Sequence, residues 1–175
     1  MKGARLRIVV PLVVLLLLSG CGYHTGGQAV RLPSDLQTIY VPAFANNTSF
    51  YAVGKAVSAA VVSELRSRTN YRILLANDGS ADATLHGAIT SASVSPLTYD
   101  SRTGRVSSAM VSVGMKASLV TRNGKVLWEN PNFQYRDQYQ VSRDVASFFE
   151  EEEPAMTRVA HDFSRTLVSA ILEAY

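Results

Sequence analysis

The sequence predicts an α+β domain, a two-layer sandwich with two amphipathic helices on one face of a mostly antiparallel, four-stranded sheet. Two segments, at about 50–68 and 154–173, carry apolar residues at helical spacing. Three long segments rich in β-forming residues follow one another between them, and a further strand precedes the first helix. Placing both helices on one sheet face buries every apolar stripe, which makes this arrangement the economical one.

The first strand and helix are predicted from residues 37–68. Residues 37–44 are rich in β-branched and aromatic side chains, and Pro42, which lacks an N–H, suits a sheet edge or a strand end. Residues 46–49 offer several N-cap side chains for the helix. The apolar stripe of that helix consists of Phe50, Val53, Val57, Ala60, Val61 and Leu65. A short apolar run at 71–75 could form a small additional strand.

A three-stranded meander is predicted over 83–99, 106–122 and 125–140. The dipeptide Asn123-Gly124 between the last two segments is a strong hairpin signal, and residues 101–105 provide a similar turn between the first two. From Ala109 to Leu119 the odd positions are apolar and most even positions are polar. This alternation predicts a sheet with one face in the core and one polar face.

The second helix is predicted over 154–173. Pro154 suits its first turn, and the acidic residues 150–153 suit the positive end of the helix dipole. Alternatively, the helix begins near Asp144, capped by Ser142, and kinks at Pro154. Both versions place the same apolar stripe on the sheet.

Residues 1–20 have the layout of a secretory signal peptide. Lys2, Arg5 and Arg7 precede an eleven-residue apolar stretch, 8–18, which is shorter than the roughly 20 residues of a membrane-spanning helix. A transmembrane anchor or a buried first helix are the alternatives. The whole chain has 17 basic and 14 acidic residues, so removal of three basic residues leaves 14 of each. A near-neutral mature protein argues against nucleic-acid binding through net charge.

Cys21 is the single cysteine of the chain, so no intramolecular disulfide can form. Leu18-Ser19-Gly20-Cys21 resembles the bacterial lipobox, in which the thiol is lipidated and the signal is cut just before the cysteine. Several acyl chains anchor a protein stably, whereas one does not. Gly22 follows the cysteine in place of the aspartate that resembles an inner-membrane retention signal in enterobacterial lipoproteins. We therefore expect a lipid anchor at Cys21 in the outer membrane, facing the periplasm, a tether at 21–36 and a single domain at 37–175.

The sequence lacks the residue patterns of an enzyme. His24, His86 and His161 have no histidine or cysteine at the spacing of a metal site, and no nucleotide-binding or nucleophile-elbow motif occurs. The acidic run 150–153 lacks the alternating ligands of a calcium loop. We expect no catalytic residues, no metal and no cofactor.

Basic residues near the predicted strand tips are the remaining candidate site. Arg102 and Arg105 flank the first hairpin turn, Arg122 and Lys125 flank the second, and Lys116 lies on the strand between them. Cations at such places can bind phosphates. They also serve as ordinary solubilising and edge-protecting residues.

The order of several short motifs after the lipobox resembles the LptE family of lipopolysaccharide-assembly lipoproteins. These motifs are CGYH at 21–24, Leu32-Pro33, TIYVPAFANNT at 38–48, ADATLHGAI at 81–89, NGKVLWE at 123–129 and the closing amphipathic helix. The resemblance spans essentially the whole mature chain. It implies a fold of two helices on a four-stranded sheet.

The resemblance also implies a function. A protein of this family would plug the large outer-membrane β-barrel LptD, help it to assemble, and take part in moving lipopolysaccharide to the cell surface. Family members bind lipopolysaccharide through basic residues, for which Arg102, Arg105, Lys116, Arg122 and Lys125 are the candidates here. The alternative is another periplasm-facing outer-membrane lipoprotein that acts as a binding or scaffolding module.

Overall fold

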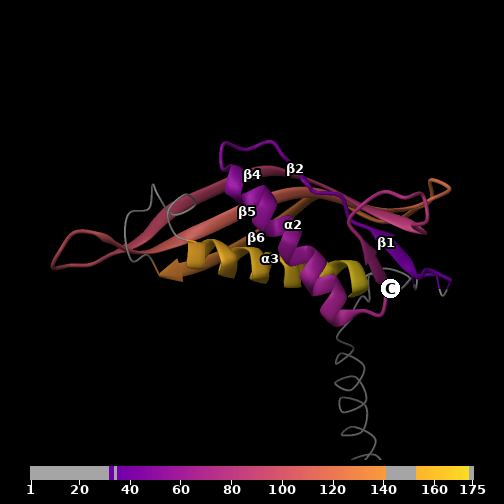
Figure 1. Cartoon of the computed structure of the whole chain (residues 1–175). Helices are drawn as coiled ribbons and strands as arrows, with labels where there is room; N and C mark the ends of the chain where they lie inside the picture. Colours follow the sequence, from indigo (N-terminus) through magenta and orange to yellow (C-terminus); the bar gives the residue numbers. More distant parts are fainter. Residues whose placement is uncertain (1–31, 34, 141–152, 174–175) are drawn as a thin grey trace, which may run out of the picture.

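The computed structural model describes residues 32–33, 35–140 and 153–173 (Figure 1). The two helices lie on the same side of one sheet, as the α+β prediction requires. In chain order the elements are β1 (Thr38–Tyr40), β2 (Ala45–Asn46), α2 (Tyr51–Arg68), β3 (Arg72–Leu74), β4 (Ala83–Tyr99), β5 (Val106–Thr121), β6 (Val126–Gln140) and α3 (Glu153–Glu173).

The sheet has six strands and is mixed, so the prediction of four mostly antiparallel strands is wrong in this detail. Its order is β3-β1-β4-β5-β6, with β2 also paired to β4. β4, β5 and β6 form the predicted antiparallel meander, whereas β1 runs parallel to both β3 and β4. The parallel pairing follows from the connection: β1 and β3 are joined through the 18-residue helix α2, and a crossover of that length returns the chain in the same direction.

The predicted strand at 37–44 is too long, because β1 ends at Tyr40 and β2 begins beyond the predicted range, at Ala45. Tyr40 pairs with Thr84, and Ala45 pairs with Ala88. Between these two pairs the first segment advances by five residues, whereas β4 advances by four. The extra residue lies around Pro42, which has no N–H to give to a ladder. The backbone N–H of Phe44 instead bonds to the Ser58 hydroxyl on α2, at 2.9 Å.

The meander follows the predicted boundaries closely. Gly124 has a φ of 84°, the left-handed conformation that the Asn123-Gly124 turn requires. Near the middle of β5 its antiparallel register shifts against both neighbouring strands. In β4 one extra residue lies between Ile89 and Ser91, and in β6 one extra residue lies between Asn130 and Phe133. Pro131 lies in that second irregularity on the edge strand β6, where its missing N–H breaks no central ladder.

The core lies between the helices and the sheet face made by the odd positions of β5. Val111, Val113 and Met115 are fully buried there, and the stripe of α2 facing them is buried as well. From α3, Phe163 is fully buried and packs edge-on against the rings of Phe133 and Tyr135, with centroids 5.4 and 5.9 Å apart. Burying a side chain of this size stabilises the fold by roughly 1.5–3 kcal/mol.

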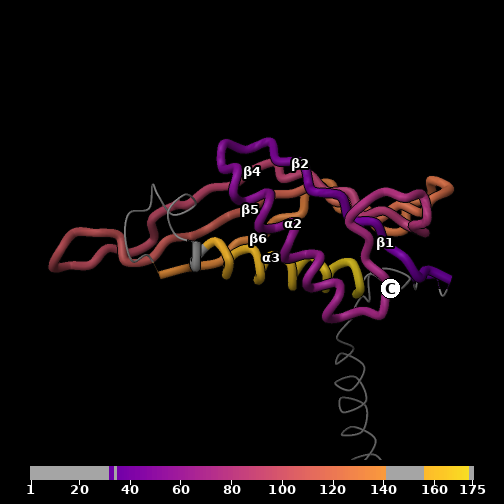
Figure 2. Tube along the Cα trace, viewed as in Figure 1, coloured from indigo at the N-terminus to yellow at the C-terminus, as the bar shows by residue number. Residues whose placement is uncertain are grey.

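Two ends of the molecule are defined by the hairpins. The β4–β5 turn projects beyond the helices at one end, and the β5–β6 turn lies at the other end (Figure 2).

α3 begins at Glu153, close to the predicted 154, and Pro154 falls in its first turn. The alternative start near Asp144 lies outside the described residues. Leu36, the last residue of the predicted tether, is buried in the core, and Leu32 packs against it.

Candidate functional site

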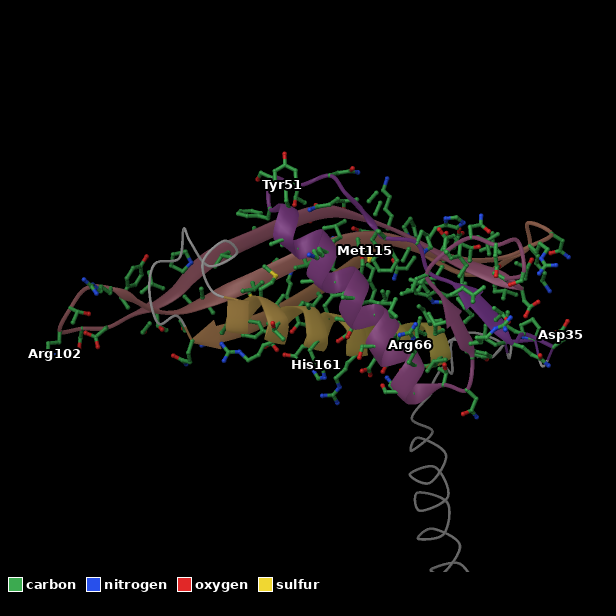
Figure 3. All side chains as sticks on the ribbon, in the orientation of Figure 1. Asp35, Tyr51, Arg66, Arg102, Met115 and His161 are labelled. Atoms are coloured by element: carbon green, nitrogen blue, oxygen red, sulfur yellow. The ribbon has the colours of Figure 1, made fainter. Side chains whose placement is uncertain are left out.

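The five candidate cations occupy three separate places on the sheet. Arg102 lies at the tip of the projecting β4–β5 hairpin, at the opposite end of the molecule from Asp35 (Figure 3). β5 has 16 residues, and strands rise about 3.3 Å per residue, so the two hairpin turns are about 50 Å apart. One phosphate-bearing group therefore cannot contact both turns at once.

The first pair, Arg102 and Arg105, is exposed at a well-formed turn. The Asp100 carboxylate accepts hydrogen bonds from the backbone N–H groups of Arg102 and Thr103 and from the Thr103 hydroxyl, which together lower the pKa of Asp100. Among the described residues, neither arginine side chain has an ion-pair or hydrogen-bond partner. Both guanidinium groups are consequently available to an anionic ligand.

The second pair, Arg122 and Lys125, is partly engaged within the domain. The Arg122 guanidinium donates to the Ala81 carbonyl at 3.0 Å and lies 3.9 Å from the Asp82 carboxylate. Asp82 in turn accepts the backbone N–H groups of Gln37 and Thr38, at 3.1 and 2.9 Å. Arg122 thus helps to hold the β5–β6 turn against the start of β4.

The surroundings of this second pair are electrically balanced. Arg122 and Lys125 line a polar depression of about 700 Å³ together with Asp35 and Asp82. Two cations face two carboxylates there, so the depression attracts an anion less than the first turn does.

Lys116 lies on the sheet face that the helices do not cover, apart from the two cation pairs. It is exposed near the middle of β5, opposite Ala88 of β4. Its neighbours on this face are hydroxyl and amide side chains; they include Ser91, Ser93, Ser112, Ser118, Gln134 and Gln138. A Cβ on Gly114 would lie 2.4 Å from the Ser91 hydroxyl oxygen and 2.7 Å from the Gln134 amide nitrogen, so these side chains crowd over the glycine. The result is a broad polar surface with few charges.

A polar cleft between α2, α3 and β6 was not anticipated from the sequence. It measures about 700 Å³, and Glu64, Arg68, Asp137, Asp162 and Arg165 are among its lining residues. Arg68 bonds to the Ser169 hydroxyl at 2.7 Å and pairs with Glu64 at 3.6 Å, which joins the two helices. The cleft therefore contains groups already paired with one another.

One tyrosine, Tyr135, lines this cleft and is hydrogen-bonded to a second, Tyr139. The hydroxyl groups of Tyr135 and Tyr139 are 2.7 Å apart, and Tyr139 donates to the Asp162 carboxylate at 3.0 Å. Burial raises the pKa of Tyr135 to about 12, and burial together with the bond to Tyr135 raises that of Tyr139 further. The four-residue spacing of the tyrosines on one strand indicates a shared face, but nothing in the sequence pairs them with Asp162.

The remaining sequence candidates contribute no chemistry among the described residues. Cys21 and His24 lie outside them. His86 is exposed on the uncovered sheet face, and His161 lies on the outer side of α3 beside Asp162, 3.2 Å from its carboxylate (Figure 3). Within the described ranges no group of three or more potential metal ligands occurs, and no helix combines the length and apolar character needed to cross a membrane.

Two solved structures with a TM-score of 0.50 or more support the fold. The chain is similar to uncharacterized lipoprotein B from Nitrosomonas europaea, at 14% identity and a TM-score of 0.50, covering 86% of this chain and 90% of that one. It is also similar to the hypothetical protein CT253 from Chlamydia trachomatis, at 11% identity and a TM-score of 0.52, covering 79% and 97%. PelC from Paraburkholderia phytofirmans, solved as a dodecamer, matches at 16% identity and a TM-score of 0.49, covering 85% and 94%.

Sequence comparison identifies the family. No protein of curated function matches the chain. The family model described as "LptE: Lipopolysaccharide-assembly", however, matches residues 36–171, which include every described strand and nearly all of α3. Because this match covers well over half of the chain, it confirms the resemblance drawn from the short motifs. The chain belongs to the LptE family of lipopolysaccharide-assembly proteins.

Proposed function

We propose that this protein is an outer-membrane lipoprotein that plugs an LptD-type β-barrel, helps it to assemble, and takes part in lipopolysaccharide transport to the cell surface. Membership of the LptE family supports a role in lipopolysaccharide assembly. The role is one of binding and scaffolding, with no catalytic residues, and it needs no cofactor. Residues 1–20 act as the signal peptide, and Cys21 carries the lipid anchor on the periplasmic side of the outer membrane.

The uncovered polar face of β4, β5 and β6 is the observation that carries the barrel proposal. Helices α2 and α3 cover one side of the sheet, and the other side presents hydroxyl and amide groups over the length of three long strands. The lumen of an outer-membrane barrel is lined by polar side chains. A face rich in serine and glutamine can exchange its water for hydrogen bonds to such a wall, and the charged side chains that it would bury are Lys116, Glu129 and Arg136.

The test is a pull-down from detergent-solubilised outer membranes. The full chain, tagged at its C-terminus, should recover a large β-barrel protein in amounts close to equimolar. Ser93→Glu together with Ser112→Glu would place two unpaired carboxylates on the polar face and should reduce recovery. Substitutions of Thr157 and Thr166 by glutamate, at exposed positions on α3, change the net charge by the same amount and serve as the control.

Two results would count against the proposal. Recovery of no large barrel, with normal surface lipopolysaccharide after depletion of the protein, would favour a different periplasm-facing scaffolding lipoprotein. For the anchor, Cys21→Ala should leave an unlipidated precursor. Labelled palmitate still incorporated into this variant would contradict lipidation at Cys21.

A further inference from the structure

The N-terminal two-thirds of α2 is apolar on more faces than the core uses. From Tyr51 to Val62 the single charged residue is Lys55. The stripe through Val53, Val57 and Val61 is buried, yet Ala59 is exposed and Tyr51 is 84% exposed. Helix α3 differs, because it presents charged and polar side chains on its outer face. An apolar helix surface beyond the core stripe is typical of a helix that is covered by something else.

This surface forms one wall of a groove. The groove has a volume of about 580 Å³ and runs between α2 and the segment that leads from β1 to β2. Phe44, Tyr51, Ala59, Val62 and Leu75 are among its apolar lining residues, and Leu75 is 61% exposed. In Figure 3, Tyr51 stands at the start of α2 and points away from the sheet, at one end of this wall.

Lys55 is the single charged residue among those lining the groove. Its ammonium group has no ion-pair or hydrogen-bond partner within the part of the chain that the structure describes. An apolar trough with one unpaired cation complements a molecule that has one anionic group and one apolar chain.

The backbone beside the groove does not favour an added β-strand. Pro42 has no N–H, and the N–H of Phe44 is already donated to the Ser58 hydroxyl. Ser58 donates its own proton to the Gly54 carbonyl at 2.7 Å, so the pair is satisfied within the domain. An occupant must therefore be recognised by apolar contact and charge, because strand addition depends on free main-chain groups.

We propose that this groove binds one long-chain fatty acid, with its carboxylate against Lys55 and its chain along Ala59, Val62 and Leu75. A volume of about 580 Å³ lies in the range of small-molecule sites, roughly 300–1,000 Å³, and admits a single chain more readily than a lipid with several chains. Each methylene removed from water strengthens binding about fourfold. The site lies on α2, away from the polar sheet face, and the proposal does not depend on the barrel or lipopolysaccharide roles.

Photolabelling tests this site in the full chain. Isolated membranes containing the protein would be incubated with palmitate carrying a diazirine and an alkyne, irradiated, and digested for peptide mapping. We expect label within residues 41–46 and 51–62 or at Leu75. Excess palmitate should compete strongly, and methyl palmitate, which has no carboxylate, should compete less.

Variants of the protein test separately the contribution of the Lys55 charge and that of the apolar groove wall to fatty-acid binding. Lys55→Gln should reduce labelling about three- to fivefold, the range for one partly exposed ion pair. Ala59→Asp should reduce it at least tenfold, because a carboxylate would face the chain. Ala59 and Leu75 are exposed, so Ala59→Asp and Leu75→Ser should keep the fold, which circular dichroism would verify. Arg158→Gln at an exposed position of α3 is the matched control and should leave labelling unchanged.

Several results would overturn the proposal. Label that maps outside the groove, or that persists in both Ala59→Asp and Leu75→Ser, would reject the site. Equal competition by methyl palmitate would reject the role of Lys55 in choosing an acid. Protection of the groove by a cross-linked protein, with no fatty-acid label, would show that α2 is a protein interface instead.

Discussion

Lipopolysaccharide binding should depend on the first cation pair far more than on the second. The double variant Arg102→Gln, Arg105→Gln removes two guanidinium groups that have no partner among the described residues, at a turn whose own acid, Asp100, is bonded to Arg102 and Thr103 backbone groups. The double variant Arg122→Gln, Lys125→Gln removes two cations that share a depression with Asp35 and Asp82.

The expected changes in Kd depend on how exposed the four cationic side chains are and on whether they already have partners within the domain. A surface cation paired with a phosphate contributes about 1 kcal/mol, so loss of both arginines should cost about 2 kcal/mol, or about 30-fold in Kd. Arg122 already donates to Ala81 and lies near Asp82, so the second double variant should change Kd less than about threefold. Added salt should weaken lipopolysaccharide binding by the wild-type protein, because exposed charges are screened. It should also reduce the difference in Kd between the two double variants.

Binding of purified lipopolysaccharide to the full chain, followed by fluorescence at two salt concentrations, provides the assay. Arg158→Gln with Arg165→Gln on α3 removes the same net charge elsewhere and should leave binding unchanged. An equal loss in this control would mean that net charge alone drives binding. If the Arg122 and Lys125 variant lost more affinity for lipopolysaccharide than the Arg102 and Arg105 variant, the inference that unpaired cations bind the ligand would be refuted.

Three further predictions concern stability and are all measurable by urea unfolding. Phe163→Ala should lower the free energy of unfolding by about 3–5 kcal/mol, since the ring is fully buried between Phe133 and Tyr135; a loss below about 1 kcal/mol would contradict this packing of α3. Stability should fall between pH 10 and 12, because the unfolded chain ionises its tyrosines near pH 10 while burial raises the pKa of Tyr135 to about 12 and that of Tyr139 further. The contribution of Tyr135 is about 2–3 kcal/mol, so Tyr135→Phe should make the slope less steep, and an unchanged slope would exclude Tyr135 as one of its sources. Asp82→Ala should lower the free energy of unfolding by about 2–3 kcal/mol, because the carboxylate accepts two backbone hydrogen bonds. Arg122→Gln should lower it by less than about 1 kcal/mol, and equal losses from the two variants would assign this stability to the ion pair between them.

Local patterns predicted the elements well where one physical preference dominated. The alternation along β5 predicted which side chains are buried, and the Asn123-Gly124 turn predicted the hairpin of β5 with β6. The stripe on α2 through Val53, Val57 and Leu65 predicted its core face. In each case the period or the turn chemistry is read within a few neighbouring residues, so the sequence contains the whole signal.

The first strand shows why some of the fold was missed. Pro42 indicates an edge or an end within residues 37–44, but no local pattern shows that a second strand begins at Ala45 or which strands lie on either side. The parallel pairing of β1 with β3 and β4 joins segments more than thirty residues apart. Strand order depends on how the helices and strands pack together, which a local pattern does not determine.

The sequence by itself determined the class of the fold, the family, and the set of basic residues available to an anion. Only the tertiary structure decided which of these cations are free, because the partners of Arg122, at Ala81 and Asp82, lie some forty residues away along the chain. The tertiary structure also placed Tyr135 and Tyr139 beside Asp162, and opened a groove between α2 and Leu75. Composition and periodicity describe neighbours along the chain, whereas a binding site is made by residues that folding brings together from distant segments.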